Sequence, residues 1–464
     1  MAQPAPSVTL ADMLDARERR AERQRSMRVR HPQAALISFT LNIAGPVKLF
    51  ELAEQAFWEG RQLIERQLAR HRLTACDGEA VVLPTGCEAL WAVEAAPLRL
   101  KALMCAIEDG GRLGRLFDID VLTPEGEILS RTALEIPPRR CLLCERPAHE
   151  CARSRAHSVE LLWDATCRII RAYFLEQRAD AVAAMACKSL LYEVSTTPKP
   201  GLVDRANCGA HRDMDLFSFL DSSAALTPHF RQLFLMGALH AQDTPQRLFD
   251  CLRYPGMLAE EDMFAATGGV NTHKGLIFSL GLVCAALGYL FSNGLPDDTD
   301  ALLALCGEMA SPAVCKDLSG VTRETATTFG ERLFVETGHA GIRDEAAAGF
   351  PSVRLFGLPA LRRFMGQGRR LNEAGALTLL VLLGHVVDTN IISRRGSEVQ
   401  RAVQQALAER MAREPLPDLD EIRALDRRFI EENISPGGCA DLLALTLMLY
   451  FLESAPERTA PGTV

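Results

Sequence analysis

The sequence predicts two domains, an N-terminal α/β (α+β) domain and a C-terminal all-α domain. At 464 residues the chain is too long for one ordinary hydrophobic core. Its first part alternates between strand-like and helix-like segments, whereas helical periodicity dominates from about Leu161 onward. We expect the boundary inside a helix between residues 168 and 180, which divides the chain into residues 1–172 and 173–464.

The elements of the first domain are predicted from the spacing of apolar residues, which alternates with polar residues in strands and follows the helical repeat in helices. Glycine and proline mark where these segments end. In chain order, we expect a strand at 36–43, a helix at 47–68, strands at 80–83 and 91–93, a helix at 98–107, and two short strands flanking the turn at 124–126.

The second domain reads as a succession of helices separated by turns. The clearest expected helices lie at 181–191, 276–291, 374–392, 398–413 and 440–452. The most apolar of them, at 276–291, is shorter than the roughly 20 residues that a membrane span needs. We therefore expect a buried core helix there and no membrane-spanning segment.

Composition excludes several classes of function. A formal charge of −8 and a pI near 5.8 argue against general nucleic-acid binding, which favours a basic excess. Fourteen cysteines without a signal peptide fit a reducing cytoplasm. The sequence has no Walker loop, G-x-G-x-x-G, nucleophile elbow or H-E-x-x-H motif, so the commonest nucleotide, hydride and hydrolase sites are not indicated.

An arginine-rich segment near the N-terminus has two interpretations. Seven arginines lie between Arg17 and Arg30, interleaved with acidic residues. The first interpretation is a solvated helix face with i,i+4 ion pairs. The second is contact with an acidic protein or a phosphate-bearing substrate.

Two aspartates in the first domain predict a metal site. Asp118 and Asp120 lie two residues apart on an expected strand, so both side chains project from one face, about 6.6 Å apart along the chain. Adjacent carboxylates repel each other unless a cation lies between them, and Mg²⁺ favours a few carboxylates completed by substrate phosphates. Arg112 and Arg115 precede the pair and suit phosphate contacts. This combination indicates phosphoryl or nucleotidyl transfer, although chance occurrence on an exposed strand is the alternative.

A cysteine cluster follows. Cys141 and Cys144 form a Cys-x2-Cys knuckle, and Cys151 and His157 could complete four zinc ligands. Structural zinc sites usually pair two knuckles, and only one is present, so reduced cysteines in a folded turn are the alternative. The neighbouring arginines, Arg139 and Arg140 among them, could instead contact phosphate.

The second domain carries a dense polar loop directly after its first apolar helix. Pro198 and Pro200 prevent the helix from continuing, and the residues up to Asp215 are rich in charge and glycine. An ordered polar loop of this length usually serves a ligand. A second loop, at 267–275, leads into the apolar helix; Asn271 or Thr272 could cap that helix.

His273 and Lys274 at the start of this helix would form an anion site, and the acidic run at 260–262 could hold a metal ion. Three further polar segments interrupt the helices, at 336–343, 388–394 and 433–441. Each alone is compatible with an ordinary turn, but a helical bundle builds its site from separate helices.

Two long motif sets point to known families. Residues 181–452 resemble triphosphoribosyl-dephospho-CoA synthase, through Pro198-Lys-Pro-Gly-Leu-Val-Asp204, Asn207-x-Gly-Ala-His211-x-Asp213-Met-Asp215 and Gly268-Gly-Val-Asn271-Thr-His-Lys-Gly275. The first part resembles apo-citrate lyase phosphoribosyl-dephospho-CoA transferase, the holo-acyl-carrier-protein synthase of citrate lyase. Its motifs are Leu41-Asn-Ile-x-Gly45-Pro-x-Lys48, Gly114-Arg-Leu-x-Asp118-x-Asp120-Val and Arg139-Arg-Cys-Leu-Leu-Cys144 with Cys151-x-Arg-Ser-Arg-x-His157.

The resemblance implies a nucleotidyltransferase-like first domain and two consecutive reactions. ATP and 3′-dephospho-CoA would give 2′-(5″-triphosphoribosyl)-3′-dephospho-CoA and adenine. That product would then be attached through phosphate to a serine of the apo-citrate lyase acyl carrier (gamma) subunit, with release of pyrophosphate. Polymerase-β-type enzymes place Gly-Ser shortly before their acidic pair, and this chain lacks it.

The resemblance also guides a provisional assignment of roles. Lys199, His273 and Lys274, with Asn271, would bind phosphate. Asp204 and Asp213 would act as metal ligand or base, and Glu261 or Asp262 would bind Mg²⁺.

Three alternatives stay open. The same chemistry could serve the acyl carrier of malonate decarboxylase, although the Arg-Arg-Cys-Leu-Leu-Cys segment favours citrate lyase. The first domain could be a zinc-containing adaptor, or the helical domain a plain nucleotide hydrolase that does not need dephospho-CoA.

Overall fold

The computed structural model describes residues 7–326 and 329–454 and divides into two compact units between Glu176 and Gln177. The first unit contains a four-stranded sheet and the second is helical in its described residues. The expected combination of a mixed unit and a helical unit is therefore confirmed. The division falls inside one long helix, α6 (Val159–Ser195).

The sheet of the first unit is entirely antiparallel, with strand order β2-β3-β1-β4. Its strands are β1 (Ala35–Leu41), β2 (Ala75–Leu83), β3 (Gly86–Val93) and β4 (Phe117–Leu122). Around it lie α1 (Leu10–Arg30), α2 (Glu51–Arg70), α3 (Pro97–Asp109), α4 (Gly111–Gly114), the 3₁₀ turn η1 (Arg131–Leu134) and α5 (Ala148–Ser154).

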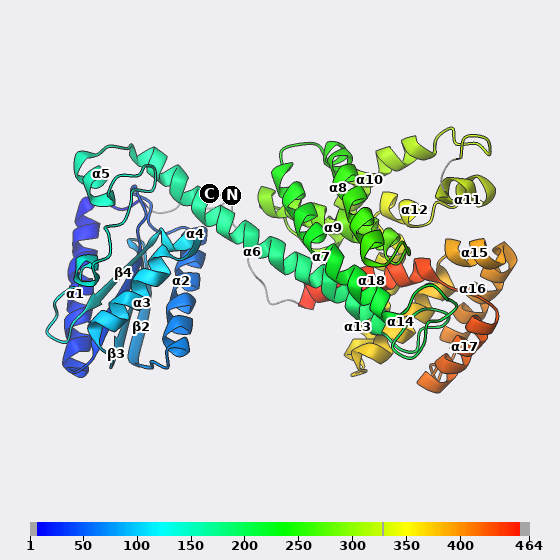
Figure 1. Ribbon diagram of the computed structural model, residues 1–464, viewed down its shortest axis with the longest axis horizontal. Coiled ribbons are helices and arrows are strands. Elements are labelled where there is room, and N and C mark those ends of the chain that lie inside the picture. The colour runs from blue at the N-terminus through cyan, green and yellow to red at the C-terminus, as the bar shows by residue number, and fades with distance from the viewer. Residues whose placement is uncertain (1–6, 327–328, 455–464) are drawn as a thin grey trace. The chain divides into compact units, whose positions relative to one another are not determined.

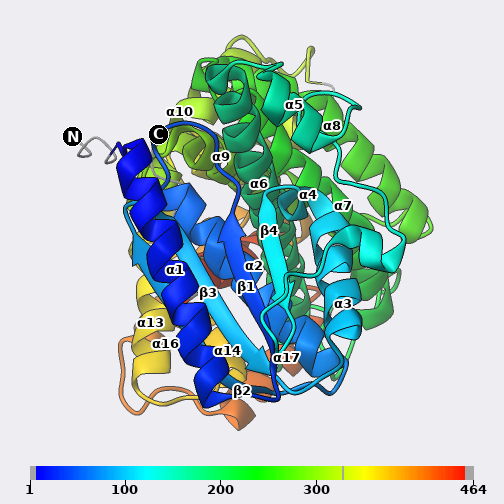
Figure 2. The same ribbon diagram turned by 90° about the vertical axis from the view of Figure 1, so that its left-hand side faces the viewer.

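Alternation along the strands creates two apolar faces. Ile37, Phe39, Phe117 and Ile119 belong to the main core with residues of α2 and α3. Leu36 points the other way, into a smaller cluster with Met27 of α1. Figure 2 shows α1 crossing the front of the sheet, with α2 behind it.

Strand β4 is an edge strand whose outer backbone groups are bound by side chains. Glu108 accepts from the N–H of Ile119 at 3.0 Å, Lys101 donates to the C=O of Ile119 at 3.0 Å, and Arg139 donates to the C=O of Phe117. These contacts close the edge against further pairing. The expected strand after the 124–126 turn is not formed; its residues make only an isolated bridge, Leu122 to Ile128.

The helical unit begins at Gln177 within α6, and further helices follow (Figure 1). Its helices are α7 (Leu216–Leu239), α8 (Pro245–Ala266), α9 (Lys274–Asn293), α10 (Thr299–Leu318), α11 (Phe329–Thr337), α12 (Ile342–Ala347), the π-helical η2 (Val353–Gly357), α13 (Leu358–Gly366), α14 (Leu371–His385), α15 (Thr389–Arg395), α16 (Ser397–Met411), α17 (Leu419–Glu431) and α18 (Gly437–Ser454). Helices α7 and α9 can approach closely because Gly237 and Gly288 have no side chains. A Cβ at either position would lie 1.9 Å from a backbone oxygen of the other helix.

The helix expected at 374–392 is two helices, α14 and α15, bent by 69° at the break. Asp388 explains the break: its carboxylate accepts from the N–H groups of Asn390 and Ile391 and so caps a new helix. Its other oxygen accepts from the N–H of Cys439 at 2.7 Å, which ties α15 to α18.

Within residues 7–326 and 329–454, the helices α9 and α18 are long and apolar enough to cross a membrane by length and composition, and the bent pair α14 and α15 passes the same test when taken together. Helix α9 has 20 residues, so the length argument made from residues 276–291 was wrong. Most of each apolar window is nevertheless buried inside the protein, 72% for α9 and 61% for α18. That burial supports the interpretation of core helices.

Candidate active sites

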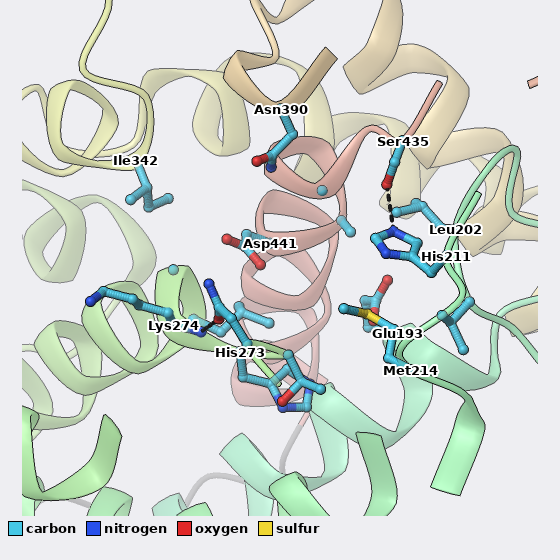
Figure 3. Close-up of a pocket in the computed structure, with 18 of the residues that line it drawn as sticks. Glu193, Leu202, His211, Met214, His273, Lys274, Ile342, Asn390, Ser435 and Asp441 are labelled. Carbon is cyan, nitrogen blue, oxygen red and sulfur yellow. Dashed lines mark hydrogen bonds between the residues drawn. The ribbon is translucent and has the colours of Figure 1, made fainter. Parts of the chain in front are cut away.

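The helical unit contains a cavity of about 400 Å³ where polar segments from distant parts of the chain meet (Figure 3). Four of the polar segments noted in the sequence, those at 193–215, 267–275, 388–394 and 433–441, contribute side chains to this cavity, and the 336–343 segment contributes Ala340 and Ile342. The polar lining residues are Glu193, Lys199, His211, Asn271, Thr272, His273, Lys274, Thr389, Asn390, Arg394, Ser435 and Asp441. We call this cavity the helical pocket.

The loop after α6 is held by side chains from later helices. Asp426 of α17 accepts from the N–H of Gly201 and from the Asn207 side chain, each at 2.9 Å. Asn372 at the start of α14 accepts from the N–H of Thr197 at 2.9 Å. These bonds fix the backbone that presents Lys199 and His211.

Lys199 forms a buried ion pair with Glu193, the last carboxylate of α6. Both side chains are 2% exposed. Burial raises the pKa of Glu193, and the neighbouring ammonium of Lys199 opposes that shift. The pair places a buried ammonium–carboxylate contact at the wall of the helical pocket.

Asp441 projects from α18 into the pocket (Figure 3). It forms no hydrogen bond or ion pair with any other described residue. Burial raises its pKa well above the ordinary value, and the carboxylates of Glu193 and Asp388 raise it further. Asp441 fits against α9 because residue 275 is glycine: a Cβ there would lie 1.9 Å from Oδ2 of Asp441.

His273 and Lys274 lie at the start of α9, next to the residue, Gly275, that packs against Asp441. His273 is 1% exposed; its Nδ1 lies 2.7 Å from Oγ of Ser222, and its Nε2 has no partner among the described residues. Burial, assisted by Lys199, lowers the pKa of His273 to about 3, so the ring is neutral. The side chain of Asn271 accepts from the N–H of Lys274 at 3.1 Å, although the capping position itself is His273.

His211 links the loop to the C-terminal polar segment. Its Nε2 lies 2.8 Å from Oγ of Ser435, and its Nδ1 lies 3.2 Å from the guanidinium of Arg394. Burial and Arg394 lower the pKa of His211. Arg394, Ser435 and Asp441 belong to two of the polar segments predicted from the sequence, but no individual role was predicted for them or for Glu193.

Four carboxylates expected at this site are not among the residues that line the helical pocket. Asp204 is 2% exposed and accepts from the N–H groups of Lys199, Ala206 and Asn207, so it shapes the loop rather than facing the pocket. Asp213 is exposed. Glu261 and Asp262 lie on the exposed face of α8, where Asp262 pairs with His229 at 2.7 Å.

Glu260, one residue before that pair, contacts the site instead. Its carboxylate lies 2.8 Å from Nζ of Lys274. The helical rotation of 100° per residue separates the three acidic side chains, and only the first turns toward α9. The geometry therefore gives no support to Glu261 or Asp262 as metal ligands.

The first unit has a second cavity, of about 270 Å³, beside the aspartate pair. Asp118 lines this cavity. In the strand register, Asp118 lies opposite Thr40 of β1 and Asp120 lies opposite Ser38, on the sheet face covered by α1. Neither aspartate forms a hydrogen bond or ion pair with another described residue. Burial and then Asp118 raise the pKa of Asp120. Two unpaired carboxylates on one face are a suitable site for a divalent cation.

The basic residues of this cavity come from α1 and from the loop after β1. They are Arg17, Arg20 and Lys48. Arg17 and Arg20 are three residues apart and therefore share a helix face. Arg20 also lies 3.2 Å from the buried carboxylate of Glu88. The second interpretation of the arginine-rich segment, a phosphate-facing surface, fits this placement.

The arginines expected to bind phosphate are engaged elsewhere. Arg139 donates to the backbone oxygens of Gly114 and Arg115 as well as Phe117, and Arg115 donates to the C=O of Cys141 at 2.8 Å. Arg140 pairs with Glu145 on the surface, and Arg112 is exposed on α4. None of the four lines the cavity beside Asp118, because their sequence proximity to the aspartates does not bring them to the same face.

The cysteine cluster forms a compact group of potential metal ligands. One ligand atom from each of Cys141, Cys144, Cys151 and His157 lies within 4.8 Å of all the others. Sγ of Cys144 is 3.4 Å from Sγ of Cys151 and 3.4 Å from Nε2 of His157. These spacings match the edges of a tetrahedron around a metal ion. The cluster could therefore hold a metal ion.

Comparison with known proteins assigns each part of the chain. A family model described as apo-citrate lyase phosphoribosyl-dephospho-CoA transferase matches residues 8–173, and one described as ATP:dephospho-CoA triphosphoribosyl transferase matches residues 179–459. Protein CitXG of Leuconostoc mesenteroides subsp. cremoris is 32% identical over 469 residues, covering 95% of this chain and 97% of that protein.

Two other relatives cover nearly the whole chain and about three fifths of it, respectively. Protein CitXG of Haemophilus influenzae is 32% identical and covers 96% of each chain. A probable 2-(5″-triphosphoribosyl)-3′-dephosphocoenzyme-A synthase of Streptococcus mutans is 38% identical over 291 residues, which are 60% of this chain and 98% of that protein.

Proposed function

The chain belongs to the family of fused proteins that join an apo-citrate lyase phosphoribosyl-dephospho-CoA transferase to a triphosphoribosyl-dephospho-CoA synthase, and we propose that its two cavities divide these activities. It is a bifunctional transferase of citrate lyase maturation. Residues 173–464 would make the triphosphoribosyl intermediate, and residues 1–172 would transfer it to the carrier. Both reactions would take place in the cytoplasm, without nucleic acid or membrane.

The helical pocket would bind ATP and 3′-dephospho-CoA. The observation that carries this proposal is the convergence of four sequence-distant polar segments on one cavity. Lys274, Asn271 and the N-terminus of α9 suit the triphosphate, since a helix N-terminus favours anions. Lys199 adds a fixed positive charge behind it. Adenine would leave as the ribose of ATP is transferred to the 2′-hydroxyl of dephospho-CoA.

The cavity beside Asp118 would catalyse the transfer in a nucleotidyltransferase-like manner. The unpaired carboxylates of Asp118 and Asp120 would hold Mg²⁺, which would neutralise charge on the departing pyrophosphate. Arg17, Arg20 and Lys48 would contact the phosphate oxygens. A serine of the apo-citrate lyase acyl carrier subunit would attack from the open side.

The proposal is tested by following both products of the pure protein. With ATP, Mg²⁺ and dephospho-CoA we expect free adenine, and with added apo-carrier we expect a carrier whose mass has grown by the prosthetic group. Adenine or phosphate release without dephospho-CoA would indicate a nucleotide hydrolase instead. If the protein modified the malonate decarboxylase carrier in preference to that of citrate lyase, the carrier substrate would be a different one and the two proposed reactions would stay the same.

We further propose that the Cys₃His cluster binds structural Zn²⁺. Replacing Cys144 by serine should remove about one equivalent of zinc and lower the melting temperature of the first unit, because the metal ties the 141–157 segment together. Metal analysis and thermal unfolding measure both effects. Cys76→Ser is the matched control, since Cys76 lies in the same unit outside the cluster. Equal metal content in both variants would contradict the zinc site.

A further inference from the structure

We propose that Asp441 is the proton donor for the departing adenine in the synthase reaction. This inference rests on the proposed function of the helical pocket and assigns a catalytic residue within it.

The position of Asp441 leaves its carboxyl available to a ligand. It lines the pocket from α18 and has no hydrogen-bond or ion-pair partner among residues 7–326 and 329–454. The nearby cations are already paired, Lys199 with Glu193 and Lys274 with Glu260. Gly275 provides the space that the carboxyl occupies, since any larger residue there would collide with Oδ2.

The surroundings favour the protonated form of this carboxyl. Burial raises the pKa of Asp441 well above its ordinary value, and the neighbouring carboxyl groups of Glu193 in α6 and Asp388 before α15 raise it further. His273 and Lys274 of α9 and Arg394 of α15 also line the pocket; His273 is neutral, and Arg394 bonds to Ala210, His211 and Asn433. A carboxylic acid that stays neutral near pH 7 is a competent general acid.

The other pocket groups are less suited to this role. Burial lowers the pKa of His273 to about 3 and also lowers that of His211, so neither imidazole carries an extra proton near pH 7. Glu193 differs from Asp441 in having a cationic partner, since it forms a buried ion pair with Lys199. Two carboxyls in one pocket, one in an ion pair and one without a partner among the described residues, are the arrangement expected of a base and an acid.

In the proposed chemical step, every bond that breaks and every proton that moves is accounted for. The bond between C1′ of the ATP ribose and N9 of adenine breaks, and its electron pair stays with adenine. Asp441 gives its proton to a ring nitrogen of the base, which leaves as neutral adenine. The 2′-oxygen of dephospho-CoA bonds to C1′ and its proton passes to the Glu193 carboxylate. Proton exchange between Glu193 and Asp441 restores the starting state.

Asp441→Asn tests the assignment when ATP is compared with N7-methylated ATP. Methylation at N7 lets the base leave without protonation. We expect Asp441→Asn to slow adenine release from ATP by about 10²–10³-fold and release of 7-methyladenine by less than about tenfold. Glu453→Gln, on the same helix outside the pocket, is the matched control and should change neither rate appreciably.

Equal losses on both substrates would assign Asp441 a merely structural role and overturn the proposal. A second measurement needs no variant. As pH rises through the pKa of Asp441, the wild-type rate with ATP should fall while the rate with N7-methylated ATP holds; parallel profiles would also overturn it. Absence of adenine release by the wild type would instead refute the proposed function itself.

Discussion

Replacing Asp120 by asparagine should abolish modification of the acyl carrier while leaving adenine release unchanged. Asparagine keeps the shape of the side chain and removes the charge that would hold the cation beside Asp118. Loss of one preorganised charge at a reacting centre typically costs about 10²–10³-fold in rate, and we expect a loss of at least about 100-fold. Mass spectrometry of the carrier and chromatography of adenine measure the two reactions in one sample.

Asp164→Asn is the control for this experiment, since Asp164 is an exposed carboxylate in the same unit, away from the cavity. It should leave both reactions at wild-type rates. If Asp120→Asn reduced adenine release as strongly as carrier modification, the division of labour between the two units would be contradicted.

Replacing Lys199 by methionine should produce the largest loss of stability in the helical unit. Lys199 and Glu193 are both 2% exposed, so the variant leaves the Glu193 carboxylate buried without its partner. Breaking such a pair costs about 3–5 kcal/mol in free energy of unfolding, which lowers the melting temperature by on the order of 10 °C. Adenine release should fall as well, because Lys199 lines the helical pocket.

The double variant Glu193→Gln with Lys199→Met separates stability from activity. Removing both charges should recover much of the lost free energy of unfolding, since no buried charge is left unpaired. Adenine release should stay low. Lys316→Met, at an exposed lysine of α10, is the control and should unfold like the wild type. A Lys199→Met protein as stable as this control would refute the buried pair.

Local periodicity in the sequence predicted the faces of elements but not their partners. The alternation of Phe117, Ile119 and Val121 with the two aspartates placed both carboxylates on one side of β4, as the structure has them. Helices α9 and α18 beside the helical pocket were predicted in the same way, whereas the break between α14 and α15 was not. Such patterns depend on neighbours along the chain, which the sequence contains.

Tertiary contacts decided the rest of the two sites. Arg139 follows the aspartates in the sequence, but its guanidinium donates hydrogen bonds to the backbone oxygens of Phe117 in the edge strand β4 and of Gly114. Glu260 rather than Glu261 or Asp262 turns toward Lys274, because the rotation of α8 relative to α9 is fixed by packing. Helical spacing could have singled out Arg17 and Arg20, since they share one face of α1.

The account depends on two separate cavities, each sufficient for one reaction. Mixing Asp120→Asn with Lys199→Met tests this most directly, with ATP, Mg²⁺, dephospho-CoA and apo-carrier present and the carrier weighed by mass spectrometry. Each variant alone should leave the carrier unmodified, and the mixture should modify it, because one protein makes the intermediate and the other attaches it. A mixture that leaves the carrier unmodified while the Asp120→Asn protein still releases adenine would contradict the account.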